Sequence, residues 1–556
     1  MVAGTKFLTM KNWIVVLFFL SMQLVIGQER KSYWVEFSNK GTSFDPFSYF
    51  DPKAIERRIV NEVNLWDSTD FPVNERYERS LEACGAEVIY SSRWLNASYV
   101  KADLQTIERI RKFQFVKEVL PAESEIIYAE TTPDELVMSN ENNSIADLSF
   151  MQIHLMNGFL FSKNNIRGKG VRIAVFDGGF PNVDVHRSFE HIRNEGRIVG
   201  TFDFTKNRAN VYRGNSHGLA TLSNIGGYNA EKQLLGLAPD AEYLLAVTEI
   251  NLEILKEEVW WVAAAEWADK NGAHIINSSL GYTEPRYAPM HMNGRYTMVS
   301  RAANIAASKG ILVINSAGNE GATPSWQIIG APADADSVLS IGGVNPENGI
   351  KINFSSFGPT AHRKLKPNVV ASGTTVAASG KNGYKIVNGT SFSAPLVSGF
   401  AACVMQMKPG LKTMEYFNLI QQSAHLYPYY DYAHGYGVPQ ADFFFDGKPI
   451  KEATFSVVYN DDSTEDDVDN NLTKTINENA QNKKPKALII RLTNKHTPEA
   501  EFKGFDYFYF HLADANGELV DYEVLIPEKE FTLHISHPKA VTFRAYYKGY
   551  YFEMNL

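Results

Sequence analysis

Four polar side chains stand out in this sequence because small residues flank each of them. Asp177 follows an apolar run and precedes two glycines, and His217 is followed by a glycine. Asn319 follows a glycine, and Ser391 lies two residues after another. Each has an ordinary structural explanation when taken alone, such as a turn residue or a helix N-cap. Their chemistry becomes specific only when they act together.

An acid, an imidazole and a hydroxyl form a nucleophilic system. Serine is a weak nucleophile near neutral pH, so a histidine has to take its proton. A carboxylate then fixes the imidazole tautomer and stabilises the imidazolium, and an amide N–H can stabilise a developing oxyanion. The chain order Asp177, His217, Ser391 is one that catalytic triads use. The sequence therefore predicts a serine hydrolase with Asn319 as the oxyanion donor.

The segment around Ser391 predicts a helix N-terminus. The apolar stretch Leu396–Met407 is helical in pattern, and Pro395 is expected in the first turn, where a missing N–H costs little. Free N–H groups at a helix start favour negative charge, which suits an oxyanion. His217 is likewise expected at the start of a helix.

The elements that must position these residues alternate between strands and helices. Helical patterns at Leu252–Asp269 and Arg295–Lys309 lie between short apolar runs. This alternation predicts an α/β domain over residues 150–446 with a doubly wound, mostly parallel sheet, whose sites gather at the carboxyl ends of the strands. The expected strands are Val171–Phe176, Tyr243–Val247, His274–Ile276, Ile311–Asn315 and Val338–Ile341.

The first 27 residues have the pattern of a signal peptide. Lys6 and Lys11 precede the apolar run Trp13–Leu20, and cleavage is expected before Gln28. A membrane anchor is the alternative, but the run is shorter than the ~20 residues that a spanning helix needs. We therefore expect an exported protein, either secreted or held in the periplasm or at the cell surface, with no stable membrane span after the signal is removed.

Residues 28–130 predict a small α+β domain. A strand at Tyr33–Phe37 is followed by helices and strands whose order suits a ferredoxin-like split βαβ arrangement. Residues 131–149 are polar and are expected to be a linker, with the cut that separates the two domains falling within residues 121–150.

The residue pattern changes after residue 446, and residues 447–556 predict a C-terminal antiparallel β domain that resembles a sandwich. Aromatic and β-branched strands dominate, and Asn516-Gly517 marks a hairpin. The acidic run Asp461–Asp469 lacks the spacing of an EF-hand, so we interpret it as a solvated loop rather than a Ca²⁺ site.

Composition limits the possible partners and stabilising bonds. The chain has 556 residues and a net charge of −9, which gives no basic footprint for nucleic acid. Its two cysteines, Cys84 and Cys403, fall in different predicted domains and cannot form a disulfide framework.

Further short stretches, in a consistent order, support a family resemblance. Residues ~150–445 resemble the subtilisin-like (subtilase) serine peptidases. The resemblance implies that Asp177, His217 and Ser391 are the triad, that Asn319 is the oxyanion-hole side chain, and that protein or peptide substrates are cleaved. The matching stretches, besides those around the four residues, are Gly236–Pro239, Ser278–Gly281, Phe354–Pro359 and Lys366–Ala371.

The resemblance also implies binding roles and partners. The stretch Ser279-Leu280-Gly281 is similar to the family's backbone strip that pairs with an extended peptide, and Ala317 and Gly318 are expected to bind substrate as well. Residues 32–120 are similar to propeptides that inhibit their own peptidase. No cofactor is expected for the chemistry. Structural Ca²⁺ is common in the family, but no metal ligand can be assigned here.

Some positions depart from the family pattern without removing a catalytic atom. Gly178 stands where many relatives have Ser or Thr, Leu219 and Ala220 stand where Thr and His are usual, and Phe392 replaces a common Met. These departures concern the shape of the site.

Two other functions stay open from the sequence. A serine-carboxyl peptidase would need Glu in place of His217 and Asp in place of Asn319, so the sequence argues against it. A binding protein on an inactive peptidase scaffold would place its function in the C-terminal β domain. Such scaffolds usually lose a triad member, and none is lost here.

Overall fold

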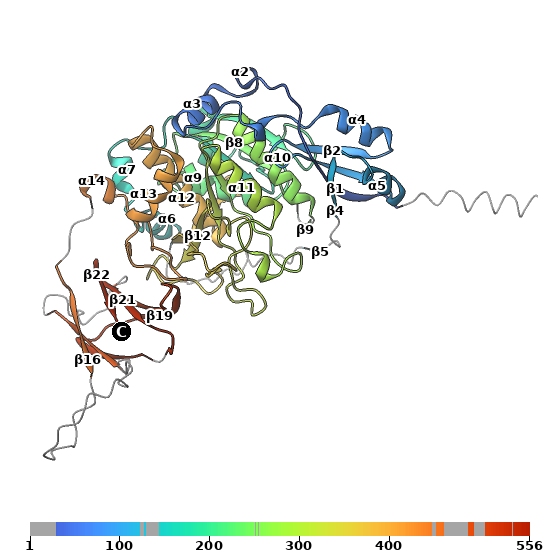
Figure 1. The fold of residues 1–556 in the computed structure, drawn as a ribbon. Helices are drawn as coiled ribbons and strands as arrows, with labels where there is room; N and C mark the ends of the chain where they lie inside the picture. Colours follow the sequence, from blue (N-terminus) through green and yellow to red (C-terminus); the bar gives the residue numbers. More distant parts are fainter. Residues whose placement is uncertain are drawn as a thin grey trace, which may run out of the picture. The chain divides into compact units, whose positions relative to one another are not determined.

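The structure is a computed structural model that describes residues 29–122, 127–128, 144–250, 252–253, 255–447, 452–460, 487–493, 506–535 and 537–556. The predicted signal peptide and the acidic run Asp461–Asp469 lie outside these residues. The chain divides into two compact units: Met1–Phe44 with Ser68–Glu125, and Asp45–Asp67 with Ile126–Leu556. We call them the propeptide unit and the peptidase unit, after the roles that the sequence predicts for them (Figure 1).

The propeptide unit is built on a four-stranded antiparallel sheet. Its order is β2-β3-β1-β4, and strands adjacent in the sheet are antiparallel. Helices α4 (Glu75–Ala83) and α5 (Leu104–Ile110) complete it. This is the predicted ferredoxin-like order, because β1 lies between β3 and β4. The strands are β1 (Lys31–Phe37), β2 (Glu87–Ser92), β3 (Ala97–Ala102) and β4 (Val116–Pro121).

The peptidase unit contains a seven-stranded sheet of order β13-β12-β11-β10-β6-β8-β7, and every pairing within it is parallel. The predicted doubly wound α/β fold is confirmed. The sequence prediction missed β7, whose short run contains a glycine, and β13. The strands are β6 (Arg172–Asp177), β7 (Ile198–Asp203), β8 (Glu242–Val247), β10 (Ile275–Ser278), β11 (Leu312–Ser316), β12 (Leu339–Val344) and β13 (Val369–Ser372).

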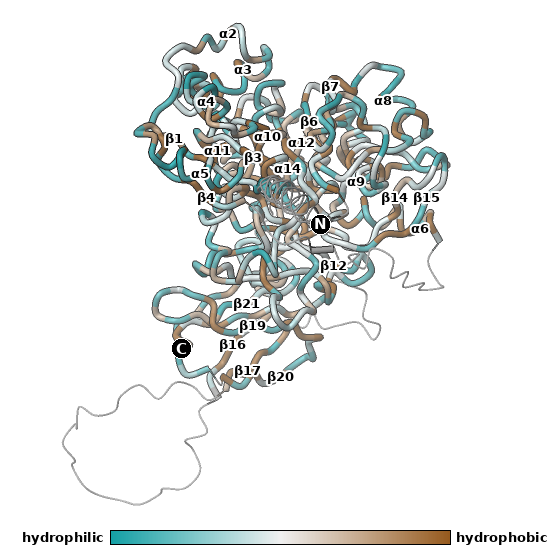
Figure 2. Tube along the Cα trace, turned by 90° about the vertical axis from the view of Figure 1, so that its right-hand side faces the viewer, coloured by the Kyte–Doolittle hydropathy of each residue, from teal (hydrophilic) through white to brown (hydrophobic). Residues whose placement is uncertain are grey.

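Helices pack around this sheet and bury its apolar strands. Residues of β6, β8, β11 and α12 share one buried core, and Figure 2 shows hydrophobic stretches recurring in the interior while hydrophilic ones lie mostly along outer loops. The helices are α2 (Pro46–Tyr49), α3 (Pro52–Val60), α6 (Ile145–His154), α7 (Phe159–Lys163), α8 (Glu190–Asn194), α9 (His217–Gly226), α10 (Lys256–Lys270), α11 (Met298–Ser308), α12 (Thr390–Met407), α13 (Thr413–Ser423) and α14 (Phe443–Asp446).

One predicted helix start is wrong, and another helix begins within the expected linker. The helix expected from Leu252 begins at Lys256, because β9 (Leu252–Glu253) instead pairs antiparallel with β5 (Ile127–Tyr128). The expected linker 131–149 overlaps α6, which begins at Ile145. There Ser144 and Asp147 form a capping box that satisfies backbone N–H groups at the helix start.

Helix α12 begins earlier than predicted. It starts at Thr390, so Pro395 lies in the second turn rather than the first. Proline has no N–H to donate to the carbonyl four residues before it. That carbonyl belongs to Ser391, and it accepts a hydrogen bond from the Ser279 hydroxyl at 2.8 Å instead. The proline therefore leaves an acceptor that ties Ser391 to the sheet.

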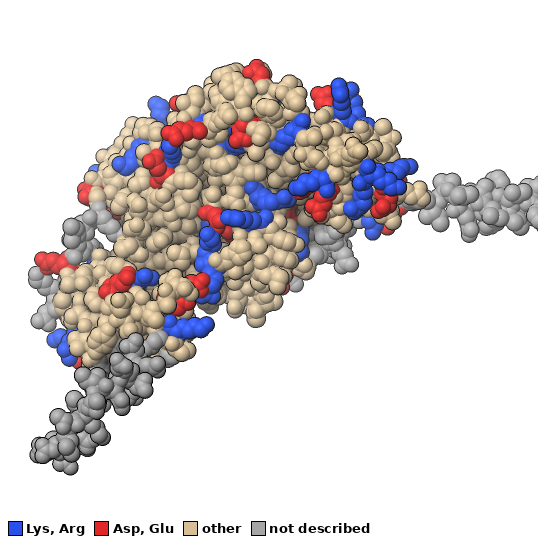
Figure 3. Space-filling view, viewed as in Figure 1, with Lys and Arg blue, Asp and Glu red and all other residues tan. Residues whose placement is uncertain are grey.

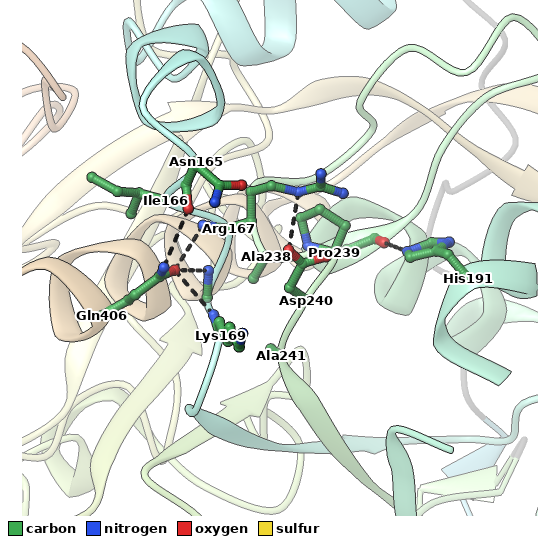
Figure 4. Close-up of polar contacts among 12 residues, drawn as sticks. Asn165, Ile166, Arg167, Lys169, His191, Ala238, Pro239, Asp240, Ala241 and Gln406 are labelled. Carbon is green, nitrogen blue, oxygen red and sulfur yellow. Dashed lines mark hydrogen bonds and ion pairs between the residues drawn. The ribbon is translucent and has the colours of Figure 1, made fainter. Parts of the chain in front are cut away.

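The far end of α12 is tied to the loop before β6. Gln406 Oε1 accepts from the backbone N–H groups of Arg167, Gly168 and Lys169 at 2.7, 2.8 and 3.0 Å (Figure 4). In the same cluster Arg167 pairs with Asp240 at 3.2 Å. These contacts fix the helix that carries Ser391 relative to the strand that carries Asp177.

The C-terminal region forms two antiparallel sheets, β16-β17-β20 and β19-β18-β21-β22, whose buried residues share one core. Gly517 has φ +79° in the predicted hairpin between β18 and β19, a conformation that favours glycine. Strands β16 and β22 were missed. The bounds are β16 (Phe455–Asn460), β17 (Ala487–Leu492), β18 (Phe508–Ala513), β19 (Leu519–Leu525), β20 (Glu530–His534), β21 (Thr542–Tyr547) and β22 (Tyr550–Asn555).

A separate hairpin precedes α12 in the chain and contacts it. It consists of β14 (Thr374–Ser379) and β15 (Gly383–Asn388).

Among the described residues, no helix is both long enough and apolar enough to cross a bilayer.

Candidate active site

Asp177 and His217 form the best-defined pair of the site. Asp177 ends β6 and is fully buried, and both of its carboxylate oxygens lie 3.0 Å from His217 Nδ1. The backbone N–H of Gly178 donates to the same carboxylate at 2.8 Å. A buried carboxylate held in this way keeps the proton on Nδ1, which leaves Nε2 to act as a base.

Glycine at position 218 permits this approach. His217 is the first residue of α9, as predicted, and Gly218 follows it. A Cβ at Gly218 would lie 2.3 Å from the carbonyl oxygen of Gly179 and 3.0 Å from Asp177 Cβ. Any larger residue would push the helix away from the strand, so the glycine sets the distance between the acid and the base.

Ser391 is in the first turn of α12, as the sequence predicts, and is mostly buried. Its hydroxyl donates to the carbonyl oxygen of Ser279 at 3.2 Å, and the Ser279 hydroxyl donates to the carbonyl oxygen of Ser391 at 2.8 Å. The next residue, Phe392, has its ring centroid 5.1 Å from that of His217. The start of α12 is thus bound to the end of β10 and packed against the imidazole.

Asn319 is oriented by the residue that precedes the serine. Its Oδ1 accepts from the Thr390 backbone N–H at 2.9 Å and lies 3.0 Å from the Thr390 hydroxyl. Because the carbonyl end of the amide is occupied in this way, the Nδ2 end is the one available to donate. Beside it, burial raises the pKa of the Glu320 carboxyl, although the Ser356 hydroxyl donates to it at 3.0 Å.

The topology explains why these residues meet. β10, β6 and β8 are neighbours in the sheet, and parallel strands end at the same edge. Asp177 ends β6, Ser279 follows β10, and Asn319 follows β11, the next strand along. The residues predicted from separate segments therefore gather at one edge.

Comparison with known proteins decides the family. The "Subtilase family" peptidase S8 model matches residues 168–440, and the "Peptidase S8 propeptide domain, Bacteroidota" model matches residues 32–135. The chain belongs to the subtilase family. It is a serine-type peptidase with an N-terminal propeptide domain.

Curated relatives agree with this membership. Subtilisin NAT of Bacillus subtilis subsp. natto is 28% identical over 327 residues, which cover 58% of this chain and 74% of the relative. Subtilisin DY of Bacillus licheniformis is 29% identical over 259 residues, covering 46% and 85%. Alkaline elastase YaB of Bacillus sp. (strain YaB) is 31% identical over 258 residues, covering 46% and 60%.

The sequence prediction missed one acidic residue of this subtilase site. Glu249 follows β8, and one ligand atom from each of Glu249, Asp177 and His217 lies within 4.8 Å of the others. A Cβ added at Gly178 would lie 3.0 Å from Glu249 Oε1. The glycine that departs from the family pattern thus leaves the space that the Glu249 side chain fills. A carboxylate directly after a strand at this edge was the available signal.

Two other departures complement each other. Ala220 and Phe392 belong to one buried cluster with Ala377 and Val387. The small side chain on α9 and the large one on α12 pack together beside His217, so together they fill the space between the two helices.

The predicted substrate-binding residues lie directly after β10 and β11. The carbonyl oxygens of Ser279 and Leu280 accept from Ser391 and from Asn315 Nδ2 at 3.2 and 2.9 Å, while Gly281 is exposed. Ala317 bonds through its backbone to Ile341 and Gly330, and Gly318 has φ +113°. The sequence prediction did not include β9, which already pairs with an extended segment, β5.

No metal is assigned to this subtilase. Within the described part of the chain, the one group of three or more close acidic, His or Cys ligands is Asp177, His217 and Glu249. Ca²⁺ takes six to eight oxygen ligands, and an imidazole with two carboxylates does not fit that preference. The group consists of the hydrogen-bonded pair Asp177 and His217 and the neighbouring Glu249.

Proposed function

We propose that this subtilase is made as the zymogen of an exported endopeptidase that cleaves peptide bonds through a covalent acyl-enzyme. One observation carries the proposal: His217 is held on Asp177 by Nδ1, while the segment that begins with Ser391 packs on the same imidazole. This arrangement supports Asp177, His217 and Ser391 as the triad.

Acylation begins when the Ser391 hydroxyl exchanges its hydrogen bond with Ser279 for one with Nε2 of His217. Catalytic hydrogen bonds are commonly loose before substrate binds. Ser391 Oγ then attacks the scissile carbonyl carbon, and its proton passes to Nε2. Asp177 remains ionised and stabilises the imidazolium.

The tetrahedral intermediate places negative charge on the former carbonyl oxygen. We assign its donors to Asn319 Nδ2 and to the backbone N–H of Ser391 at the start of α12. Collapse of the intermediate breaks the C–N bond, and His217 gives its proton to the leaving amine. Water then attacks the acyl-enzyme by the same sequence of proton transfers and releases Ser391.

Inhibition by the chain's own N-terminal region is supported by two observations. Residues 32–135 match a propeptide family, and β5, near the end of that region, pairs with β9. An extended segment paired in this way imitates a bound peptide. We propose that β5 occupies the peptide-binding edge until the chain is cut between residues 121 and 150.

Export is supported by the predicted signal peptide, residues 1–27. N-terminal sequencing of the protein recovered from outside the producing cell is expected to show that these residues are gone. Recovery of the uncut N-terminus from the cytoplasmic fraction alone would reject export.

The catalytic assignment is tested with Ser391→Ala. We expect this variant to fold, to lose casein hydrolysis and to lose labelling by a fluorophosphonate probe. Hydrolysis at the wild-type rate would overturn the assignment of Ser391. A properly processed wild-type protein that takes no label would instead favour a binding protein on a peptidase scaffold, and an activity maximum near pH 3–4 would favour a serine-carboxyl mechanism.

Self-processing is tested by comparing the N-termini of secreted wild-type and Ser391→Ala protein. We expect only the wild type to begin within residues 121–150. Identical processed N-termini would assign maturation to another protease.

A further inference from the structure

One segment of the propeptide family match folds with the peptidase. The match covers residues 32–135, yet Asp45–Asp67 belongs to the peptidase unit. We call residues 45–67 the clamp segment. It contains α2 and α3, which appear in blue against green elements of the peptidase unit in Figure 1.

Two arginines of the clamp segment bury their charges on one carboxylate. Arg57 and Arg58 are 4% and 0% exposed, and Asp269, near the end of α10, is 2% exposed. Arg58 lies 2.5 Å from Asp269 Oδ2, and Arg57 pairs with Oδ1. Charged side chains are rarely fully buried, and Figure 3 shows many of them on one face of the surface. Full burial of three charges at one contact is therefore unusual.

Arg57 also donates hydrogen bonds to backbone carbonyls that follow the two neighbouring helices. Its guanidinium donates to the carbonyl oxygens of Ala273 and of Lys309, the latter at 3.2 Å. Ala273 follows α10, and Lys309 caps α11. Carbonyls at helix ends lack partners within the helix, and at Lys309 the clamp segment supplies one.

The peptidase surface is shaped for α3 at two glycines. Gly272 and Gly310 have φ +73° and +88°. A Cβ on Gly272 would lie 2.8 Å from Lys53 Cβ, and one on Gly310 would lie 2.6 Å from Asn61 Nδ2. The absence of a side chain at these two glycines lets Lys53 and Asn61 of the clamp segment approach closely.

Further contacts surround the buried arginines. Asp51 pairs with Arg172 at 3.2 Å, and Lys53 pairs with Glu242 at 3.2 Å. Asn61 Oδ1 accepts from the backbone N–H of Thr413 at 2.7 Å. Lys309, 1% exposed, pairs with Asp67 at 3.2 Å. The partners come from β6, β8, α11 and α13, so the clamp segment is joined to several separate elements.

We propose that the clamp segment stays bound to the peptidase after the chain is cut within residues 121–150, as a second, noncovalently held chain of the mature enzyme. The proposal rests on the proposed zymogen processing. Departure of the segment would leave the buried Asp269 carboxylate without its two arginine partners, and an uncompensated buried charge is strongly unfavourable. The segment therefore becomes a structural part of the mature enzyme.

The mature enzyme tests this directly. Wild-type protein is activated until its peptidase rate is constant, passed over a size-exclusion column under native conditions, and then denatured for intact-mass spectrometry. We expect a peptide containing residues 45–67 in equimolar amount with the catalytic chain. An active peak that contains the catalytic chain without any peptide from this segment would overturn the proposal, and this measurement needs no variant that might fail to fold.

Variants then test whether the buried pairs hold the segment. Arg57→Ala/Arg58→Ala should weaken retention roughly a hundredfold or more, as expected when a buried ion pair loses one partner. Arg79→Ala is the matched control, because Arg79 is in α4 with a side chain that is 71% exposed. Equal retention in the double variant and the control would show that Arg57 and Arg58 do not hold the segment and would overturn their role.

Failure of processing can be distinguished from failure of retention. A cleavage site for an unrelated, sequence-specific protease is inserted between residues 129 and 143 of Ser391→Ala protein, and the cut protein is analysed in the same way. Retention of the N-terminal fragment that depends on Arg57 and Arg58 supports the proposal even if the chain cannot process itself. Release of the fragment from the folded, cut protein rejects it.

Discussion

Asn319 Oδ1 accepts a hydrogen bond from the backbone N–H of Thr390, the residue immediately before the proposed nucleophile, at 2.9 Å. The Thr390 hydroxyl lies 3.0 Å from the same oxygen and 3.1 Å from the carbonyl oxygen of Gly318. The start of α12 and the loop after β11 are therefore joined by the amide that we assign to the oxyanion hole. Thr390 acts as a positioning residue.

Removing the Asn319 amide with Asn319→Ala should lower kcat roughly 10²–10³-fold with little change in KM, because the donor acts mainly in the transition state. That magnitude comes from subtilisin itself. Thr390→Val should lower kcat less, since the backbone N–H remains to hold Asn319. Steady-state kinetics on one peptide substrate measure both effects.

Thr390→Ser supplies the control, because it retains the hydroxyl. We expect it to restore most of the kcat lost in Thr390→Val. If the serine and valine variants are equally slow, the hydroxyl does not position Asn319.

Glu249 gives the imidazole a second carboxylate neighbour besides Asp177. Negative charge beside His217 favours the protonated ring, whereas the general base has to be neutral. Glu249→Gln should therefore move the acidic limb of the kcat/KM profile to lower pH, by a few tenths to about one pH unit. The profile is measured between pH 5 and pH 9.

The matched control for this shift is Glu242→Gln, which alters a carboxylate at the opposite end of β8. Its profile should keep the wild-type limb. An unchanged limb in Glu249→Gln would mean that Glu249 does not influence the charge of His217.

The sequence predicted the positions of Asp177 and His217 in the fold because each residue is part of a local pattern. Asp177 ends an apolar run, and His217 begins a helix, and both patterns are visible within a few residues. A parallel sheet containing five of the seven strands could also be expected, since buried parallel strands are continuous apolar runs.

Features that depend on distant partners could not be predicted. Arg57 and Asp269 are 212 residues apart in the sequence, and each would ordinarily be exposed to solvent. Glu249 lacks flanking glycines, so no local pattern distinguishes it from other acidic residues. Pro395 was placed one turn too early, because α12 begins at Thr390 and the Ser279 hydroxyl supplies the donor that the proline lacks.

His274 predicts acid sensitivity of the peptidase unit. Its Nδ1 accepts the Arg172 backbone N–H at 3.0 Å, and burial, together with nearby Arg57 and Lys53, lowers the pKa of His274 from 6.5 to about 3. Between about pH 3 and pH 6.5, His274 therefore binds a proton in the unfolded chain but not in the folded chain. Stability from this group is complete above pH 6.5 and is lost as the pH falls toward 3.

In the Ser391→Ala background, the free energy of unfolding should fall by up to roughly 1.4 kcal/mol per pH unit in this window through His274 alone. His274→Asn should flatten that dependence, while the exposed His362→Asn should not. Urea unfolding at several pH values measures it. The role of His274 would be contradicted if the free energy of unfolding depended on pH equally in the Ser391→Ala protein with and without His274→Asn.

Gly281 tests the proposed peptide-binding strip without disturbing the fold. It is exposed, and a Cβ added there meets no atom within 4 Å. Gly281→Ala should therefore leave Tm unchanged, whereas a peptide paired along Ser279-Leu280-Gly281 would meet the new methyl group. We expect KM for an extended peptide to rise several-fold and KM for a short ester substrate to stay constant.

Gly218→Ala is the contrasting variant, because its Cβ would lie 2.3 Å from the Gly179 carbonyl oxygen and should lower both Tm and kcat. If Gly281→Ala hydrolyses the extended peptide with wild-type KM, the peptide does not bind along this strip.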